Sequence, residues 1–198
     1  MSSLVVSEFV TIDGVIEDPG GAEGSAHGGW SMRFSSGPEG GAFKFEELLA
    51  AGALLLGRVT YEGFAAAWPT MEGTGEFGER MNALPKFVVS STLERADWNN
   101  STIVRGDLPA EVRALKERLA GDIVVFGSSQ LVQALIAHDL IDEYRLMVYP
   151  VLLGGGKRLF AERGTATDLQ LVDMKQAGDT AILTLHRRPA AGSQPSGG

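Results

Sequence analysis

Asp122–Leu135 reads DIVVFGSSQLVQAL, and this stretch decides the fold. An apolar run rich in β-branched residues ends at Gly127, and an apolar pattern with helical spacing begins after two serines. The pattern predicts a strand that enters a helix through a Gly–Ser turn. Such a turn directs several backbone N–H groups and the positive end of a helix dipole towards one point, which suits a phosphate. The same residues would also suit an ordinary capped turn that binds no ligand.

Each polar position of this turn has a possible role. Gly127 has no Cβ, so the backbone can approach a ligand or a neighbouring helix closely. Ser128 can cap the helix, and Ser129 and Gln130 add side-chain donors. The segment is neither a G-x-G-x-x-G fingerprint nor a P-loop, because it lacks the spaced glycines and the lysine.

A second segment of the same kind is Gly57-Arg58-Val59-Thr60, again between an expected strand and an expected helix. Thr60 can cap that helix and offer its hydroxyl to a phosphate. The guanidinium of Arg58 presents a planar fork for phosphate oxygens and a face on which adenine can stack. A capped helix with a surface arginine would look the same.

A third polar pair, Ser90 and Ser91, follows the apolar run that begins at Lys86. Hydroxyls at a strand end can bond a ribose or its 2′-phosphate, although serines are common at such places. Ligands of open α/β sheets bind at the carboxyl ends of the strands. Two phosphate-type turns at that edge therefore favour a dinucleotide.

Two carboxylates are candidates for proton delivery or substrate anchoring, namely Asp13 and Glu143. Each also has a structural interpretation: Asp13 precedes Gly14 in a turn-forming pair, and Glu143 can simply begin a strand. Gly154 and Gly155 form either a flexible turn or a close-approach site beside the ligand. We include both glycines among the candidate cofactor-binding residues.

Strands alternate with helices along the chain before a final hairpin. This order predicts an α/β fold with a mostly parallel mixed sheet and an antiparallel C-terminal hairpin. The expected strands are 4–10, 53–56, 86–91, 101–104, the run before Gly127, 143–151, 169–174 and 180–186. The expected helices are 43–51, 60–67, one that starts near Pro109 and ends at Gly121, and one after Ser129.

A long segment, residues 17–41, is rich in Gly, Glu, Ser and Pro and contains one large aromatic residue, Trp30. A loop of this length within a compact domain is usually a functional lid or a disordered segment. Trp30 favours the lid, and we expect it to contact the substrate.

The length of 198 residues and the 44% hydrophobic content fit one domain, expected over residues 1–188. The Pro/Gly/Ser-rich tail, 189–198, is expected to be disordered. The net charge of −8 argues against general binding to nucleic acid or to a membrane surface.

Absent residue types exclude several kinds of chemistry. The chain has no cysteine, which removes disulfides, thiolate catalysis and zinc sites built on thiolates. Its histidines, His27, His138 and His186, have no ligand spacing, so we expect no metal site. The first residues lack a secretory signal and no apolar run approaches the length of a membrane span, so a cytoplasmic location is the default expectation.

Taken together, these segments resemble the dihydrofolate-reductase-like superfamily. The most similar branch is named for the reductase domain of the bacterial bifunctional riboflavin-biosynthesis deaminase-reductase. The resemblance runs from about residue 3 to residue 187. It is carried by Ser7 with Ile12-Asp13-Gly14, by Gly57–Glu62, Phe87–Ser91 and Val125–Ser129, and by Leu140–Tyr144 and Pro150–Phe160.

This resemblance implies a three-layer fold around a central mixed sheet and a homodimeric, NADPH-dependent reductase. Arg58 and Thr60 would meet cofactor phosphates, and Ser90 and Ser91 would meet the adenosine ribose phosphate. The pyrophosphate would be cradled by Gly127, Ser128, Ser129 and Gln130. The small-molecule substrate would lie over the nicotinamide, between the first strand and the loop that carries Trp30.

Two departures from the superfamily pattern narrow the expected activity. Folate-reducing members carry a carboxylate one helical turn before an inward Phe; if Phe45 is that Phe, the position is Gly41, so dihydrofolate reduction is disfavoured. Glu46 and Glu47 are expected to face elsewhere. The H-x-E and P-C-x-x-C signature of the zinc deaminase half is also absent.

The resulting expectation is an NADPH-dependent reductase of a pyrimidine- or pterin-like small molecule. It would resemble 5-amino-6-(5-phosphoribosylamino)uracil reductase of riboflavin biosynthesis, which reduces a ribosyl group to its ribityl form. A phosphorylated substrate needs basic residues, and the candidates are Arg33, Lys157 and Arg158. The alternative is a non-catalytic nucleotide- or flavin-binding sensor module.

Overall fold

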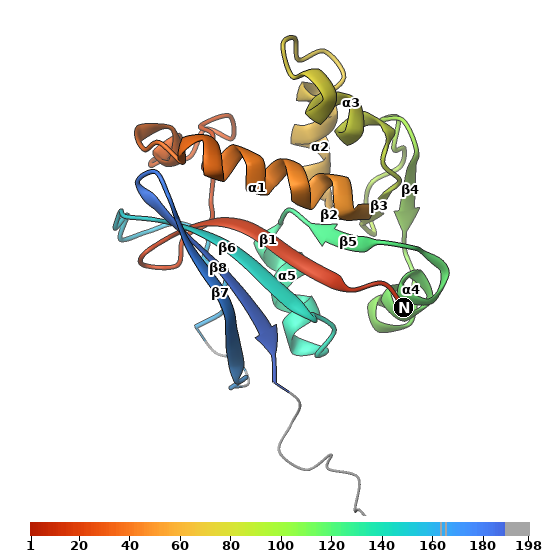
Figure 1. Ribbon diagram of the computed structural model, residues 1–198. Coiled ribbons are helices and arrows are strands. Elements are labelled where there is room, and N and C mark those ends of the chain that lie inside the picture. The colour runs from red at the N-terminus through yellow and green to blue at the C-terminus, as the bar shows by residue number, and fades with distance from the viewer. Residues whose placement is uncertain (163, 165, 189–198) are drawn as a thin grey trace, which may run out of the picture.

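A computed structural model describes residues 1–162, 164 and 166–188, and the tail expected to be disordered lies outside this range. The described chain is built on an eight-stranded sheet of order β4-β3-β2-β5-β1-β6-β8-β7 (Figure 1). The strands are β1 (Leu4–Thr11), β2 (Ala51–Gly57), β3 (Lys86–Val89), β4 (Ser101–Val104), β5 (Asp122–Val125), β6 (Glu143–Tyr149), β7 (Leu169–Ala177) and β8 (Thr180–Arg187). β1 to β6 pair in parallel, and the β7–β8 hairpin joins β6 in antiparallel fashion. The expected mixed sheet with an antiparallel end is confirmed.

Helices cover both faces of the parallel part of the sheet, so the fold has three layers (Figure 1). One face carries α1 (Gly37–Ala50), α2 (Arg58–Ala67) and α3 (Gly75–Ala83). The other carries α4 (Leu108–Arg118) and α5 (Ser129–Ala137), and a short 3₁₀ helix, η1 (Trp30–Arg33), precedes α1.

Alternating side chains of the central strands feed the two cores. Leu55 of β2 and Val125 of β5 pack with α4 and α5, while Leu54 and Val124 pack with α1, α2 and α3. All four are fully buried. This explains why these strands read as continuous apolar runs, since both of their faces are covered.

The feature that positions the site is the difference in length between β1 and its neighbour β5. Pairing of β1 with β5 ends at Val6 opposite Val125, whereas pairing of β1 with β6 continues to Thr11 opposite Tyr149. Beyond Val6, one edge of β1 therefore faces the β5–α5 turn instead of a strand.

Two α-helices differ from the sequence-based expectation. α1 begins at Gly37, before the expected start at Phe43, because Pro38 occupies the first turn, where its missing N–H costs nothing. The glycines in its first half hid this start. α3 was missed, because its sequence GEFGERMNA contains two glycines and few apolar residues.

Candidate functional site

The two glycine turns predicted from the sequence contact each other at the carboxyl edge of the sheet. The Gly57 N–H donates to the Gly127 carbonyl oxygen at 3.4 Å, and a Cβ added at Gly57 would collide with the Ser128 hydroxyl. Gly127 has a φ of +75°, and a Cβ there would lie 3.1 Å from Thr60 Oγ1 and 3.5 Å from Glu8 Oε1. Both positions therefore require glycine.

The helices that follow the two turns start side by side. α2 begins at Arg58 and α5 at Ser129, and neither N-cap, Gly57 or Ser128, provides a side-chain acceptor to its helix. The first N–H groups of a helix lack intrahelical partners and carry the positive end of its dipole. Two such ends at one place can bind the anionic groups of a ligand.

The polar side chains predicted around these turns differ in how accessible they are. Arg58 is exposed and pairs with Glu62 at 2.8 Å, a surface ion pair that a ligand phosphate can replace. Thr60 is half-buried, Ser129 is buried beneath the turn and Gln130 is exposed.

The serine pair after β3 has a structural role in the described chain. Ser90 is buried, and its hydroxyl accepts the N–H groups of Thr92 and Leu93 at 3.2 and 2.9 Å. Ser91 is exposed, and its carbonyl accepts a bond from Arg105. Ser91 is thus the more available of the two for a ribose or its phosphate.

Asp13 holds the turn after β1 against the glycine run. Its carboxylate accepts bonds from Thr11 Oγ1 at 2.6 Å, Leu153 N–H at 3.3 Å and Gly154 N–H at 2.8 Å. These donors, the Thr11 hydroxyl foremost, lower the pKa of Asp13 to about 2. The carboxyl group is thus ionised at neutral pH and accepts hydrogen bonds. This fits the turn-forming role of Asp13 better than proton delivery. A Cβ added at Gly155 would meet no atom within 4 Å, so the close-approach role predicted for this glycine stays a prediction.

Glu143 lies at the amino end of β6, opposite Val5, and is not brought to the glycine turns. Its Oε1 accepts from Arg145 Nε at 2.6 Å, and the same guanidinium bonds Asp122 at 2.9 Å. Its Oε2 lies 3.1 Å from His186. The proton-delivery role predicted for Glu143 stays a prediction, and the observed role is to join three strands.

Trp30 anchors the segment that was predicted to be a lid. Its side chain is fully buried, its indole N–H donates to the Glu17 carbonyl at 2.8 Å, and its ring meets Tyr149 edge-on at 5.2 Å. With no exposed surface, the indole holds the loop to the sheet, and this arrangement does not support the predicted contact with a substrate.

The helix acid was expected to be absent, but α1 does carry an inward carboxylate. Glu47 is buried, contrary to the expectation, and its Oε1 accepts from Ser7 Oγ and Lys44 Nζ, both at 2.8 Å. Gly41, taken as the equivalent position, is exposed, and Phe45 packs against Phe77 of α3. The helix is therefore rotated relative to the alignment assumed from the sequence.

One residue of the site was missed entirely, namely Glu8 of β1. Its Oε1 is buried and has no hydrogen-bond partner among the described residues. Burial raises the pKa of Glu8 to about 8, although the Lys44 charge and the Gly127 N–H oppose the shift. A lone charged residue in the strand LVVSEFVT, whose other residues are apolar or carry a hydroxyl, was the signal that could have revealed it.

The basic residues considered for a substrate phosphate are largely engaged. Lys157 pairs with Glu17 at 2.7 Å, and Arg158 bonds the Asp13 carbonyl. Arg33 lies over the Phe34 ring at 5.9 Å.

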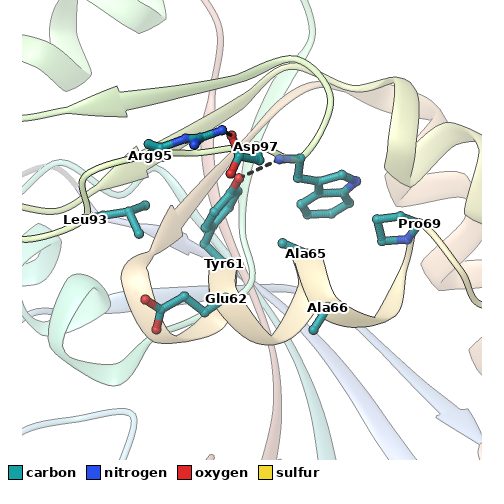
Figure 2. Close-up of a pocket in the computed structure, with 9 residues that line it drawn as sticks. Tyr61, Glu62, Ala65, Ala66, Pro69, Leu93, Arg95 and Asp97 are labelled. Carbon is teal, nitrogen blue, oxygen red and sulfur yellow. Dashed lines mark hydrogen bonds and ion pairs between the residues drawn. The ribbon is translucent and has the colours of Figure 1, made fainter.

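A cavity of about 390 Å³ lies on the other flank of α2. Figure 2 shows Tyr61, Ala65 and Pro69 on one wall and Leu93 and Arg95 on the other, with the Tyr61 hydroxyl bonded by the Trp98 N–H at 3.0 Å. None of its lining residues belongs to the glycine turns, although one of them, Glu62, is the ion-pair partner of Arg58.

Within residues 1–162, 164 and 166–188, no group of three His, Asp or Glu side chains is placed to hold a metal ion. In the same residues no helix is long and apolar enough to cross a membrane.

Comparisons with known proteins agree with this architecture. The uncharacterized protein YyaP of Bacillus subtilis is 28% identical over 175 residues, which covers 87% of each chain. A crystal structure of a putative riboflavin biosynthesis protein from Shewanella sp. PV-4 has a TM-score of 0.73 at 20% identity, covering 94% of this chain and 99% of that one. A dihydrofolate reductase from Enterococcus faecalis, complexed with NADP(H) and RAB-propyl, has a TM-score of 0.52 at 18% identity, covering 94% and 97%.

The structural matches show that the three-layer arrangement is a dihydrofolate-reductase-like fold. Residues 2–183 match the family described as the RibD C-terminal domain, which covers nearly all of the chain. The predicted resemblance is confirmed, and the protein belongs to the RibD C-terminal domain family.

Proposed function

We propose that this protein is an NADPH-dependent reductase of a pyrimidine- or pterin-like small molecule. The observation that carries the proposal is the meeting of the β2–α2 and β5–α5 turns, at which two helix N-termini and two Cβ-free glycines share one edge of the sheet. Membership of a family with reductase-type relatives supports it.

The residues at this edge fit a dinucleotide phosphate. Ser128, Ser129 and the N–H groups that begin α5 would hold the pyrophosphate, and Arg58 and Thr60 would hold the phosphate on the adenosine ribose. When bound, NADPH would supply a hydride. The chain's own contribution is to bind and orient the two ligands and to exclude water between them.

The charge around the site favours a substrate without a phosphate. Lys157 already pairs with Glu17, and Arg158 bonds the Asp13 carbonyl, so a substrate phosphate would have to displace both contacts. The chain as a whole carries a net charge of −8, which repels anions wherever local cations are missing. We therefore favour a neutral heterocycle over a phosphoribosylated one.

The test is titration of the purified protein with NADPH and NADH, followed by cofactor absorbance in the presence of pyrimidines, pterins and quinones. Tight NADPH binding with oxidation by a heterocycle supports the proposal. Tight binding without oxidation by any of these compounds would favour the sensor alternative, and absence of binding would refute both.

Arg58→Ala tests how the cofactor is recognised. If the guanidinium meets the 2′-phosphate, the affinity for NADPH should fall by about 10-fold to 100-fold, and that for NADH should change much less. The matched control is Arg113→Ala on exposed α4, which should change neither. Equal losses for both cofactors would contradict the role.

A further inference from the structure

The position of Glu8 in the sheet is unusual for an acidic residue. It lies two residues beyond the last β1–β5 pair, Val6 opposite Val125, on the face that Val6 and Val10 present to α5. The β5–α5 turn occupies the space where a neighbouring strand would otherwise continue. The carboxyl group is therefore directed at the turn that is the centre of the candidate site.

The geometry leaves one oxygen of this carboxyl group unused. Glu8 Oε1 lies 3.5 Å from the point where Gly127 would carry a Cβ, and Thr60 Oγ1 lies 3.1 Å from the same point. The two oxygens thus flank Gly127, and Oε1 is buried without a partner among the described residues. An unpaired buried polar atom is costly, so a group that remains unpaired at a site is a candidate for ligand contact.

The charged groups packed around Glu8 do not neutralise it. Lys44 of α1 is the cation that acts on it, but the Lys44 ammonium already bonds Ser7 and Glu47. Glu47, also from α1, adds a like charge. From the α2 and α5 sides it faces the Thr60 hydroxyl and the Gly127 backbone, which carry no charge. Burial therefore dominates and favours the protonated acid.

We propose that Glu8 of β1 holds a proton at neutral pH and, beside the cofactor phosphates bound at the Gly127 turn, presents this proton to the substrate that lies along β1, as the proton donor of the site. This inference rests on the proposed reductase function and adds the group that the sequence left unidentified. In contrast, Asp13 and Glu143 are already engaged by several donors.

Reduction of a C=O or C=N bond adds a hydride to carbon and a proton to oxygen or nitrogen. Glu8 would supply that proton: the O–H bond of its carboxyl group breaks, the electron pair stays on the oxygen, and the proton bonds to the substrate atom that has received the π electrons. Water then returns a proton to the carboxylate. A donor whose pKa lies near the working pH is suited to this transfer.

The first test needs no cofactor. Carboxyl ¹³C NMR of protein labelled at the glutamate side chains, compared with Glu8→Gln, identifies the Glu8 signal. We expect its titration midpoint near pH 8, where burial places it. A midpoint near the ordinary value of 4.5 would overturn the proposal.

The second test is NADPH affinity as a function of pH. As Glu8 ionises, a hydrogen-bond donor is lost and a negative charge appears beside an anionic ligand, so the affinity should fall about tenfold from about pH 7 to about pH 9. Glu8→Gln retains a donor that cannot ionise, and its affinity should be flat over this range. Glu117→Gln on exposed α4 is the matched control and should behave like the wild type.

The outcomes separate this inference from the function on which it rests. If NADPH binds but wild type and Glu8→Gln show the same pH dependence, the inference fails and the reductase proposal stands. If NADPH binds at no pH, the reductase proposal fails, and the NMR midpoint alone then decides whether Glu8 holds the proton.

Discussion

Two carboxyl groups near the carboxyl end of the sheet, Asp13 in the turn after β1 and Glu8 within β1, have opposite surroundings. At the turn after β1, Asp13 accepts three hydrogen bonds, and its pKa falls to about 2. In β1, facing the turn after β5, Glu8 Oε1 has no hydrogen-bond partner among the described residues, and the Glu8 pKa rises to about 8.

The contrast separates a group that builds the fold from one that is available to a ligand. A carboxylate whose lone pairs are filled by local donors stabilises a turn, and it has little capacity left for chemistry. A carboxyl group such as that of Glu8, whose burial outweighs the few donors around it, is destabilised in its charged form and stays protonated. Perturbed pKa values of the second kind are typical of functional sites.

The largest expected effect concerns the pH dependence of folding at Glu8. Its pKa is raised on folding from 4.5 to about 8, so its stabilising contribution is complete below about 4.5 and is lost as the pH rises towards 8. The loss should be about 3 to 5 kcal/mol between these limits. Denaturant unfolding at several pH values should show this loss in the wild type and not in Glu8→Gln. If the free energy of unfolding depends on pH in the same way in both proteins, Glu8 does not differ from an ordinary carboxyl group.

Asp13 should show the opposite dependence. Because its folded pKa is lowered, its contribution is present above the unfolded value of 3.8 and is lost as the pH falls towards 2. Asp13→Ala should cost about 2 kcal/mol at neutral pH, since the Leu153 and Gly154 N–H groups lose their acceptor. The cost should shrink in acid, as measured by urea unfolding; a cost that does not depend on pH would show that the charge is unimportant.

Gly127→Ala and Gly154→Ala form a matched pair, because both glycines have a φ of +75°. Each substitution should cost about 1 to 2 kcal/mol of folding free energy through backbone strain. Only a Cβ at Gly127 meets Thr60 and Glu8, while that at Gly154 meets open space. NADPH titration should therefore show about tenfold weaker binding for Gly127→Ala than for Gly154→Ala. Similar losses would place the cofactor against both turns.

The smallest expected effect tests the cation beside Glu8. Lys44 lowers the Glu8 pKa, so Lys44→Met should move the NMR midpoint upwards by about one unit. Arg80→Met, on α3, removes a cation that bonds the Leu48 and Ala51 carbonyls instead, and should leave the midpoint unchanged. A downward shift in Lys44→Met would contradict the electrostatic picture.

Much of the fold could be predicted from local sequence. Gly57 and Gly127 were identified because each ends an apolar run and precedes a helical pattern, and the parallel sheet then brings both to one edge. The hairpin around Gly178 was found for the same reason, since turn chemistry is local.

The surroundings of other residues could not be predicted, because they depend on the length of a neighbouring strand, the rotation of a helix or a partner distant in the sequence. Glu8 of β1 faces the Gly127 turn because the neighbouring strand β5 ends at Val125, and the sequence around Glu8 does not reveal where β5 ends. Glu47 faces inward, towards Ser7 of β1, because α1 is rotated relative to the assumed alignment. Trp30 looked like a lid residue, but its partner Tyr149 is far away in the sequence.

The early end of β5 also determines how this kind of site can change. Each residue of a strand adds about 3.3 Å of length, so extending or shortening β5 by one residue would move the ligand-binding turn by that step along β1. A different residue of β1 would then face the turn, because successive side chains point to opposite faces. The length of β5 thus sets how far along β1 the ligand-binding turn lies and which side chain of β1 faces it. The loops around the site can then change which ligands fit without altering this arrangement.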